Sequence, residues 1–234
     1  MKSLLDYPGL GYPCELKQHN GKNVSLSVYP NNRIVVRYPK RITTKFIIEF
    51  LHERKTWVRD QYEKNKKNNP KKTIFAEGEI IPIFGTDKKM IHSLSQPSLI
   101  NEKNFILNIK GLKTEKGRIL RANKFLRGEL EKRAIPILQK YALRIKTKDY
   151  QLRIKTMRSL WGSCSPKNVI TLNLALIFCP DFVFRYVIIH EMSHTVERNH
   201  SNRFWNLLES LDPDYELAEK WIKSNGKKIL CYLF

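Results

Sequence analysis

The sequence predicts an α+β protein, because short alternating segments and longer helical ones follow each other along its 234 residues. Apolar residues alternate with polar ones in the short segments, and they recur every three to four residues in the long ones. The chain is 41% hydrophobic, which excludes a disordered tail and supplies enough apolar surface for a sizeable core. We expect a β-rich portion with one long helix over residues 1–115, and a more helical domain over residues 116–234.

The first portion contains a predicted β-hairpin, in which Pro30-Asn31-Asn32 forms the turn between two alternating segments. Thr43 or Thr44 is a suitable N-cap for the helix that follows, because a threonine hydroxyl can accept a bond from an unpaired amide of the first turn. The polar tract from Lys64 to Lys72 predicts a loop. The elements expected here are strands at 24–29 and 33–38, a helix to about residue 66, and strands at 79–84, 88–92 and 105–109.

The second portion is predicted to hold most of the helices. Pro136 should kink or split the first of them, since proline lacks the amide proton that a helix needs. Asp181 is the expected N-cap of the helix that starts after Pro180, and the last helix should begin after Asp212 and end near Gly226. The expected elements are a helix at 122–142, strands at 152–155 and 169–174, and helices at 181–198, 202–211 and 213–224.

Positive charge is concentrated in the first two thirds of the chain. Residues 1–80 contain 16 basic and 8 acidic side chains, residues 81–160 contain 19 and 6, and residues 161–234 contain 8 and 8. Such a distribution attracts nucleic acid or nucleotides. A lysine-rich composition produces the same numbers without any function, and the sequence contains no zinc-finger, RNP-like or glycine-rich phosphate-binding motif to separate the two interpretations.

The composition favours a cytoplasmic protein without a membrane segment. No apolar run approaches the roughly 18 residues that span a bilayer, and the first residues do not resemble a signal peptide. The cysteines are scattered without a CxxC pair, which indicates reduced thiols rather than a disulfide framework. They are Cys14, Cys164, Cys179 and Cys231.

The motif that points to chemistry is His190-Glu191-Met192-Ser193-His194, within a predicted helix. Residues four apart lie on one helix face, so both imidazoles can bind one metal ion. Three imidazole ligands suit Zn²⁺ and leave a position for water, whose proton Glu191 can accept. His200 is the expected third ligand, returned to the metal by a turn at Asn199. The alternative is a surface helix with two unrelated histidines, but apolar residues on both sides of the motif favour a buried helix.

Four segments resemble the YgjP-like metallopeptidase-domain family, which is related to the SprT-like proteases. They are 158–165, 170–174, 186–194 and 199–205, and weaker similarity extends through the first portion. The resemblance implies a zincin-like catalytic domain over residues 116–234, with zinc bound by His190, His194 and His200 and with Glu191 as catalytic base. The ligand spacing also matches metzincins, but Glu197 replaces their turn glycine and no methionine follows Met192.

We therefore expect a zinc-dependent metallopeptidase that acts on a peptide or protein substrate. Two alternatives use the basic residues 1–160: a metal-dependent pyrophosphatase acting on nucleoside triphosphates, and a nucleic-acid-associated protease of the SprT-like kind. A structural zinc domain is disfavoured, because three ligands and a glutamate leave the fourth coordination position open.

Several other residues have two interpretations each. The strand around Asn173 is a candidate edge for pairing with an extended peptide. Arg158 or Tyr186 is a candidate donor to an oxyanion, although a structural role is favoured for each. Cys164 is expected to be an inert turn residue rather than an inhibitory metal ligand. Three aromatic residues are expected in the core rather than in contact with substrate: Trp161, Phe204 and Trp205.

Overall fold

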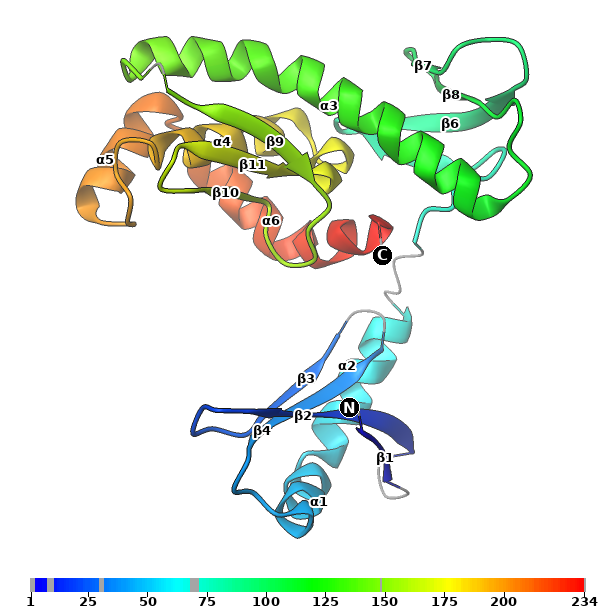
Figure 1. Cartoon of the computed structure of the whole chain (residues 1–234), viewed down its shortest axis with the longest axis vertical. Helices are drawn as coiled ribbons and strands as arrows, with labels where there is room; N and C mark the ends of the chain where they lie inside the picture. Colours follow the sequence, from blue (N-terminus) through cyan, green and yellow to red (C-terminus); the bar gives the residue numbers. More distant parts are fainter. Residues whose placement is uncertain (1–2, 8–10, 30–31, 68–71, 148, 234) are drawn as a thin grey trace. The chain divides into compact units, whose positions relative to one another are not determined.

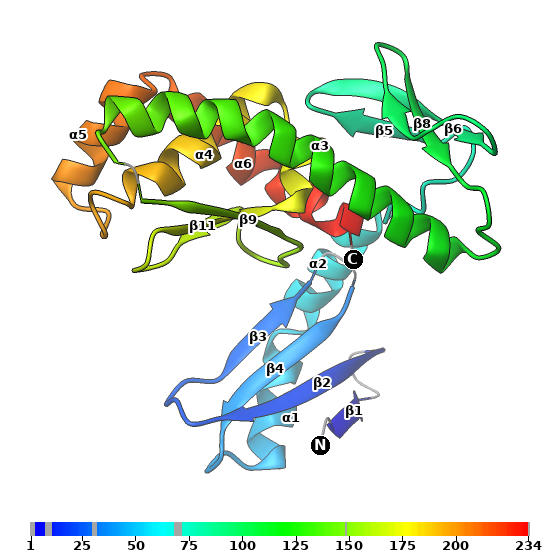
Figure 2. The same ribbon diagram turned by 45° about the horizontal axis from the view of Figure 1, so that its top comes forward.

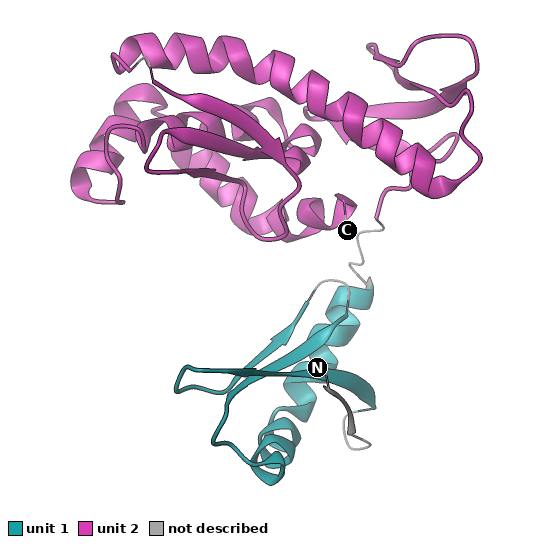
Figure 3. Ribbon diagram, viewed as in Figure 1, with its two compact units in different colours: residues 1–71 teal, residues 72–234 magenta. Residues whose placement is uncertain are grey.

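The computed structural model describes residues 3–7, 11–29, 32–67, 72–147 and 149–233, and it confirms the α+β class (Figure 1). The chain divides into two compact units, residues 1–71 and 72–234 (Figure 3). The sequence placed this division near residue 115 instead. Residues 72–115 belong to the second unit because their apolar side chains enter the same core as the C-terminal helices.

The first unit is a four-stranded sheet with two helices (Figure 2). Strands β3 and β4 form the predicted antiparallel hairpin, whereas β1 and β2 were not predicted. Thr43 caps the first helix by accepting a bond from the amide of Phe46 at 3.3 Å. The single helix expected here is interrupted at Arg54. The elements are β1 Ser3–Tyr7, β2 Tyr12–His19, β3 Ser25–Val28, β4 Ile34–Pro39, α1 Thr44–Glu53 and α2 Lys55–Lys67.

The second unit begins with another four-stranded sheet, of order β5-β6-β8-β7. Its strands are β5 Ile80–Ile83, β6 Thr86–Ser93, β7 Leu99–Ile100 and β8 Asn104–Asn108. The long helix α3, Glu115–Arg144, connects this sheet to the rest of the unit (Figure 1). Phe105 of β8 stacks on Phe125 of α3 at 5.5 Å, and the amide of Phe84 bonds the carbonyl of Ile177. These contacts explain why residues 72–115 fold with the helical part.

Helix α3 continues through Pro136, so the predicted split is wrong. Pro136 lies on the exposed side of the helix, where its ring meets solvent rather than the core. The residues on the opposite side recur at intervals of three or four and remain buried, which stabilises the helix on both sides of the proline. They are Ala122, Leu126, Leu130, Ala134, Leu138 and Tyr141.

The second sheet of this unit has the order β10-β11-β9. Its strands are β9 Gln151–Lys155, β10 Gly162–Cys164 and β11 Val169–Asn173, followed by a buried 3₁₀ helix, η1 Leu174–Phe178. Strand β11 pairs with β9 in parallel and with β10 in antiparallel fashion. The strand around Asn173 is therefore central, and its prediction as an edge is wrong. The short strand β10, which the sequence did not predict, is an edge of this sheet.

The last helices are α4 Asp181–Ser193, α5 Asn202–Leu211 and α6 Tyr215–Leu230, followed by the 3₁₀ helix η2 Cys231–Leu233. Pro180, not Asp181, is the N-cap of α4, because the carboxylate of Asp181 accepts bonds from Arg133 at 2.7 and 3.0 Å. The N-cap position of helix α6 is occupied by Asp214 rather than Asp212, and the Asp214 side chain makes no capping bond. It runs through Gly226, where a Cβ would lie 3.1 Å from the ring of Trp161.

Helix α4 is the centre of the second unit. It packs against α3 on one side and against β10 and β11 on another, so nine of its thirteen residues are buried. A helix that is apolar nearly all round requires this position. Among the residues with described structure, the four cysteines are free thiols and no helix is both long and apolar enough to cross a membrane.

Candidate metal centre

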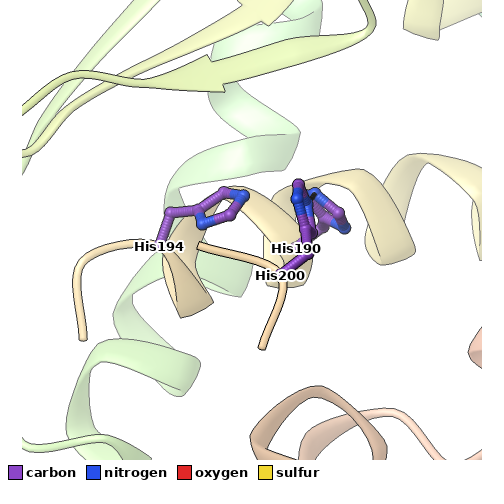
Figure 4. Close-up of side chains that lie close together, drawn as sticks. All are labelled: His190, His194 and His200. Carbon is purple, nitrogen blue, oxygen red and sulfur yellow. Dashed lines mark hydrogen bonds between the residues drawn. The ribbon is translucent and has the colours of Figure 1, made fainter. Parts of the chain in front are cut away.

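Three histidines converge at the end of α4. His190 lies in the last turn of the helix, His194 is its C-cap, and His200 comes from the loop before α5 (Figure 4). One ring nitrogen from each lies within 4.8 Å of the others, and the Nε2 atoms of His190 and His200 are 3.1 Å apart. Two nitrogens that share a tetrahedral zinc ion lie about 3.3 Å apart. The three predicted ligands are therefore together, at a spacing that a single ion can bridge.

The helix ends at Ser193, five residues before the predicted end. The hydroxyl of Thr195 donates to the carbonyl of Met192 at 2.7 Å, and the amide of Glu197 bonds the carbonyl of Ser193 at 2.9 Å. These bonds satisfy the last carbonyls of the helix without another helical turn. The loop can then return His200 to the helix end, so the turn begins well before Asn199, the residue expected to make it.

Hydrogen bonding and burial keep two of the predicted ligands, His190 and His194, in the neutral form. His194 Nδ1 lies 2.9 Å from the carbonyl oxygen of Glu197, which only accepts, so Nδ1 carries the proton and Nε2 is free to bind metal. Burial, with smaller contributions from His194 and His200, lowers the pKa of His190 to about 3. Burial also lowers the pKa of His194. Both rings are therefore neutral at pH 7, as metal ligands must be, and the donor set fits a divalent ion such as zinc.

Phe204 contacts all three imidazole rings. Its ring stacks on His194 with 4.5 Å between the ring centroids, and it makes edge contacts with His190 at 4.9 Å and with His200 at 4.7 Å. Phe204 is fully buried, which confirms its core position, while Trp161 and Trp205 are partly buried against the same core. A rigid aromatic surface beneath the imidazoles limits their rotation. This contact with the imidazoles was not predicted from the sequence, although Phe204 lies only four residues after His200.

Glu191 lies beside the ligands and against the edge strand β10. Its side chain is 6% exposed, and burial raises the pKa of its carboxyl group to about 8. A Cβ at Gly162 would lie 2.6 Å from both Cγ and Oε1 of Glu191. Only glycine leaves room for the Glu191 side chain at this point of β10, a constraint that the sequence alone did not reveal.

Replacing Gly162 with alanine is expected to displace the Glu191 carboxylate and to lower kcat of a reaction that uses Glu191 by about 10- to 100-fold. Metal affinity should stay within twofold of wild type, because the added methyl group meets Glu191 rather than the imidazoles. Steady-state kinetics and chelator competition measure the two quantities. The matched control is Gly128→Ala in α3, where a Cβ meets no atom within 4 Å. Equal activities of the two variants would contradict this role.

His200 lies in the loop after α4, and Arg198 of the same loop forms hydrogen bonds with the β10–β11 turn. Its guanidinium donates to the carbonyl of Ser165 at 2.9 Å and to Asn168 Oδ1 at 2.5 Å, and it contacts the sulfur of Cys164 at 3.8 Å. Cys164 is thus a neighbour of this anchor. Among the described residues, the group able to hold a metal ion comprises the three histidines without Cys164.

The remaining candidate residues have structural positions. Asn173 bonds the backbone of Met157 and Leu160, with its Nδ2 donating at 2.7 and 2.6 Å. The hydroxyl of Tyr186 meets His190 at Nδ1, the edge of the ring away from Nε2, which does not suit an oxyanion donor. Arg158 lies exposed between β9 and β10, and its role as an oxyanion donor stays a prediction.

A buried helix with two histidines four residues apart, an intervening glutamate and a third histidine in the next loop defines a metallopeptidase. The chain belongs to the YgjP-like family, since the model of the YgjP-like metallopeptidase domain matches residues 22–225. The family confirms the predicted resemblance and identifies the chain as a hydrolase that uses a divalent metal.

Two crystal structures of metallopeptidase zymogens are also similar. Jannalysin of Methanocaldococcus jannaschii is 23% identical, with 40% of this chain and 95% of that chain covered and a TM-score of 0.35. Abylysin of Pyrococcus abyssi is 23% identical, with 42% and 92% covered and a TM-score of 0.34. No curated protein sequence matches the chain.

Proposed function

We propose that this chain is a zinc-dependent peptidase in which His190, His194 and His200 hold the metal and Glu191 is the general base. The observation that supports this most directly is the convergence of three imidazoles beside a buried glutamate. Zinc bound there would lower the pKa of a water molecule and polarise the substrate carbonyl.

Glu191 performs the proton transfers. It accepts a proton from the attacking water as the oxygen bonds to the peptide carbonyl carbon, and it delivers that proton to the nitrogen as the C–N bond breaks. Burial raises the pKa of its carboxyl group, which makes the carboxylate a stronger proton acceptor than an exposed glutamate. The contact with Gly162 keeps the carboxylate at the edge strand, where the substrate would lie.

The edge strand β10 is the proposed binding surface for the peptide backbone. The amide of Asn173 bonds the carbonyl of Trp161, and the amide of Ser165 bonds the carbonyl of Val169, so these residues of β10 and its flanks pair with β11. Backbone groups alternate in direction along an antiparallel strand, so those of Gly162 and Cys164 point to the outer edge. An extended peptide that adds to this edge lies next to Glu191. The strand proposed for this role therefore changes from β11 to β10.

A substrate screen tests the proposed function. The zinc-loaded 234-residue chain is incubated separately with denatured casein and with a mixture of nucleoside triphosphates. We expect new peptide termini by mass spectrometry with the zinc-loaded protein, and none after chelator treatment. Release of pyrophosphate from nucleotides without peptide cleavage would instead support the pyrophosphatase and contradict the peptidase.

A second candidate is recruitment of the peptidase to nucleic acid. The charge distribution favours it: the net charge of +21 resides in residues 1–160, while residues 161–234 are neutral. Binding to double-stranded DNA should then be measurable at low salt and should fall steeply as salt is raised. Cleavage of casein without retention on DNA at low salt would contradict recruitment and leave the peptidase in place.

A further inference from the structure

At Nδ1 of His190, the ring nitrogen away from His200, two side chains form a short hydrogen-bonded chain. The hydroxyl of Tyr186 lies 3.3 Å from His190 Nδ1, and it donates to Oε1 of Glu219 at 3.0 Å. Tyr186 precedes His190 by one turn of α4, whereas Glu219 lies on α6. The chain of contacts therefore connects a solvent-exposed carboxylate to a predicted metal ligand through a buried phenol.

The Tyr186 hydroxyl has a single proton, and this fixes which group donates in each of its two hydrogen bonds. Here the hydroxyl donates that proton to Oε1 of Glu219. The oxygen of Tyr186 can therefore only accept from His190, so Nδ1 of that ring carries a proton. A neutral imidazole with a proton on Nδ1 has its lone pair on Nε2, which is the atom 3.1 Å from Nε2 of His200.

We propose that Tyr186 and Glu219 are positioning residues that hold His190 in the tautomer and ring orientation needed to bind the metal. The proposal rests on the zinc site of the proposed function. A carboxylate at the end of such a chain also increases the basicity of the ligand, as it does where it contacts a zinc-bound histidine directly. His194 has a backbone carbonyl in the equivalent place, so both ligands contributed by α4 are oriented from behind.

The structure also explains why the two partners should contribute unequally. Tyr186 is 5% exposed and touches the ligand, so its hydroxyl acts where water does not compete. Glu219 is exposed and acts only through Tyr186, so water can replace part of its effect. Removing the hydroxyl should therefore weaken metal binding more than removing the carboxylate, and the two losses should not add.

The test measures the zinc affinity of the 234-residue chain by chelator competition. We expect Tyr186→Phe to weaken binding by about 10- to 100-fold, and Glu219→Ala by about 3- to 10-fold. The double variant should match Tyr186→Phe, since Glu219 acts through Tyr186. Glu219→Gln keeps an acceptor oxygen and should restore most of the affinity. With cobalt in place of zinc, Tyr186→Phe should change the visible absorption bands of the bound ion.

Glu216→Ala is the matched control, because Glu216 is another exposed glutamate of α6, one turn before Glu219. A purely structural tie between α4 and α6 would lower the free energy of unfolding of the metal-free variants and leave zinc affinity unchanged, which would overturn the proposal. If Tyr186→Phe does not fold, the Glu219 variants still test the proposal, because the exposed Glu219 side chain can be replaced without disturbing the core. A wild-type protein that binds no zinc would overturn the proposed function as well, so the two failures are distinguishable.

Discussion

Replacing Glu191 with glutamine is expected to lower kcat for peptide hydrolysis by about 100- to 10,000-fold while the protein keeps its metal. The amide has nearly the same size and shape as the carboxylate, so it fits against Gly162, but it cannot accept a proton from water. The three imidazoles are unchanged, so the zinc content should equal that of wild type. Steady-state kinetics on a cleaved peptide and elemental analysis of the same preparation measure both quantities.

The matched control for this variant is Glu209→Gln, the same exchange at an exposed position of α5. It should leave both activity and zinc content unchanged. Activity of Glu191→Gln within threefold of wild type would show that another group accepts the proton, and the proposed mechanism would be wrong. A loss of zinc together with activity would instead give Glu191 a role in building the site.

The local part of this centre was predictable from the sequence. Helical periodicity places His190 and His194 on one face, and the apolar residues around them require a buried helix, as α4 is. The next histidine, His200, follows at a distance that a short loop can span. These inferences need only the geometry of a helix and the preference of zinc for imidazole.

The parts that the sequence did not reveal depend on contacts between distant segments. Gly162 matters because β10 crosses Glu191, and Glu219 matters because α6 packs against α4. Neither residue has a local pattern that distinguishes it from an ordinary glycine or a surface glutamate. The edge position of β10 likewise follows from the strand order, which alternation of residues cannot specify.

Errors in the predicted elements have a related origin. Pro136 does not end α3, because burial of Ala134 and Leu138 on the other face outweighs the lost hydrogen bond. Asp181 does not cap α4, because its carboxylate is engaged by Arg133 of α3. In both places a tertiary interaction overrides a local preference that was correctly identified. The division of the chain near residue 71 rather than 115 has the same cause, since a shared core determines which segments fold together.

The three imidazoles are held in place by neighbouring groups that contact their rings. Two rings are held from behind by Tyr186 and by the carbonyl of Glu197, and all three rest on Phe204. These contacts orient the imidazole nitrogens toward one another, which is the arrangement that binding of one metal ion requires. Removing one of the three should consequently have a larger effect on metal binding than any change in the supporting residues.

His200→Ala is expected to weaken zinc binding by about 100- to 1,000-fold, since a structural site of four ligands binds with about 10–16 kcal/mol, or roughly 3 kcal/mol for each. His200 is exposed and lies in a loop, so the fold should persist. Zinc should raise the thermal midpoint of wild type and not of the variant at the same concentration. His52→Ala, in α1 of the first unit, is the control and should behave as wild type. Equal zinc affinity of His200→Ala and wild type would remove His200 from the ligand set, and with it the basis for a three-histidine metal site.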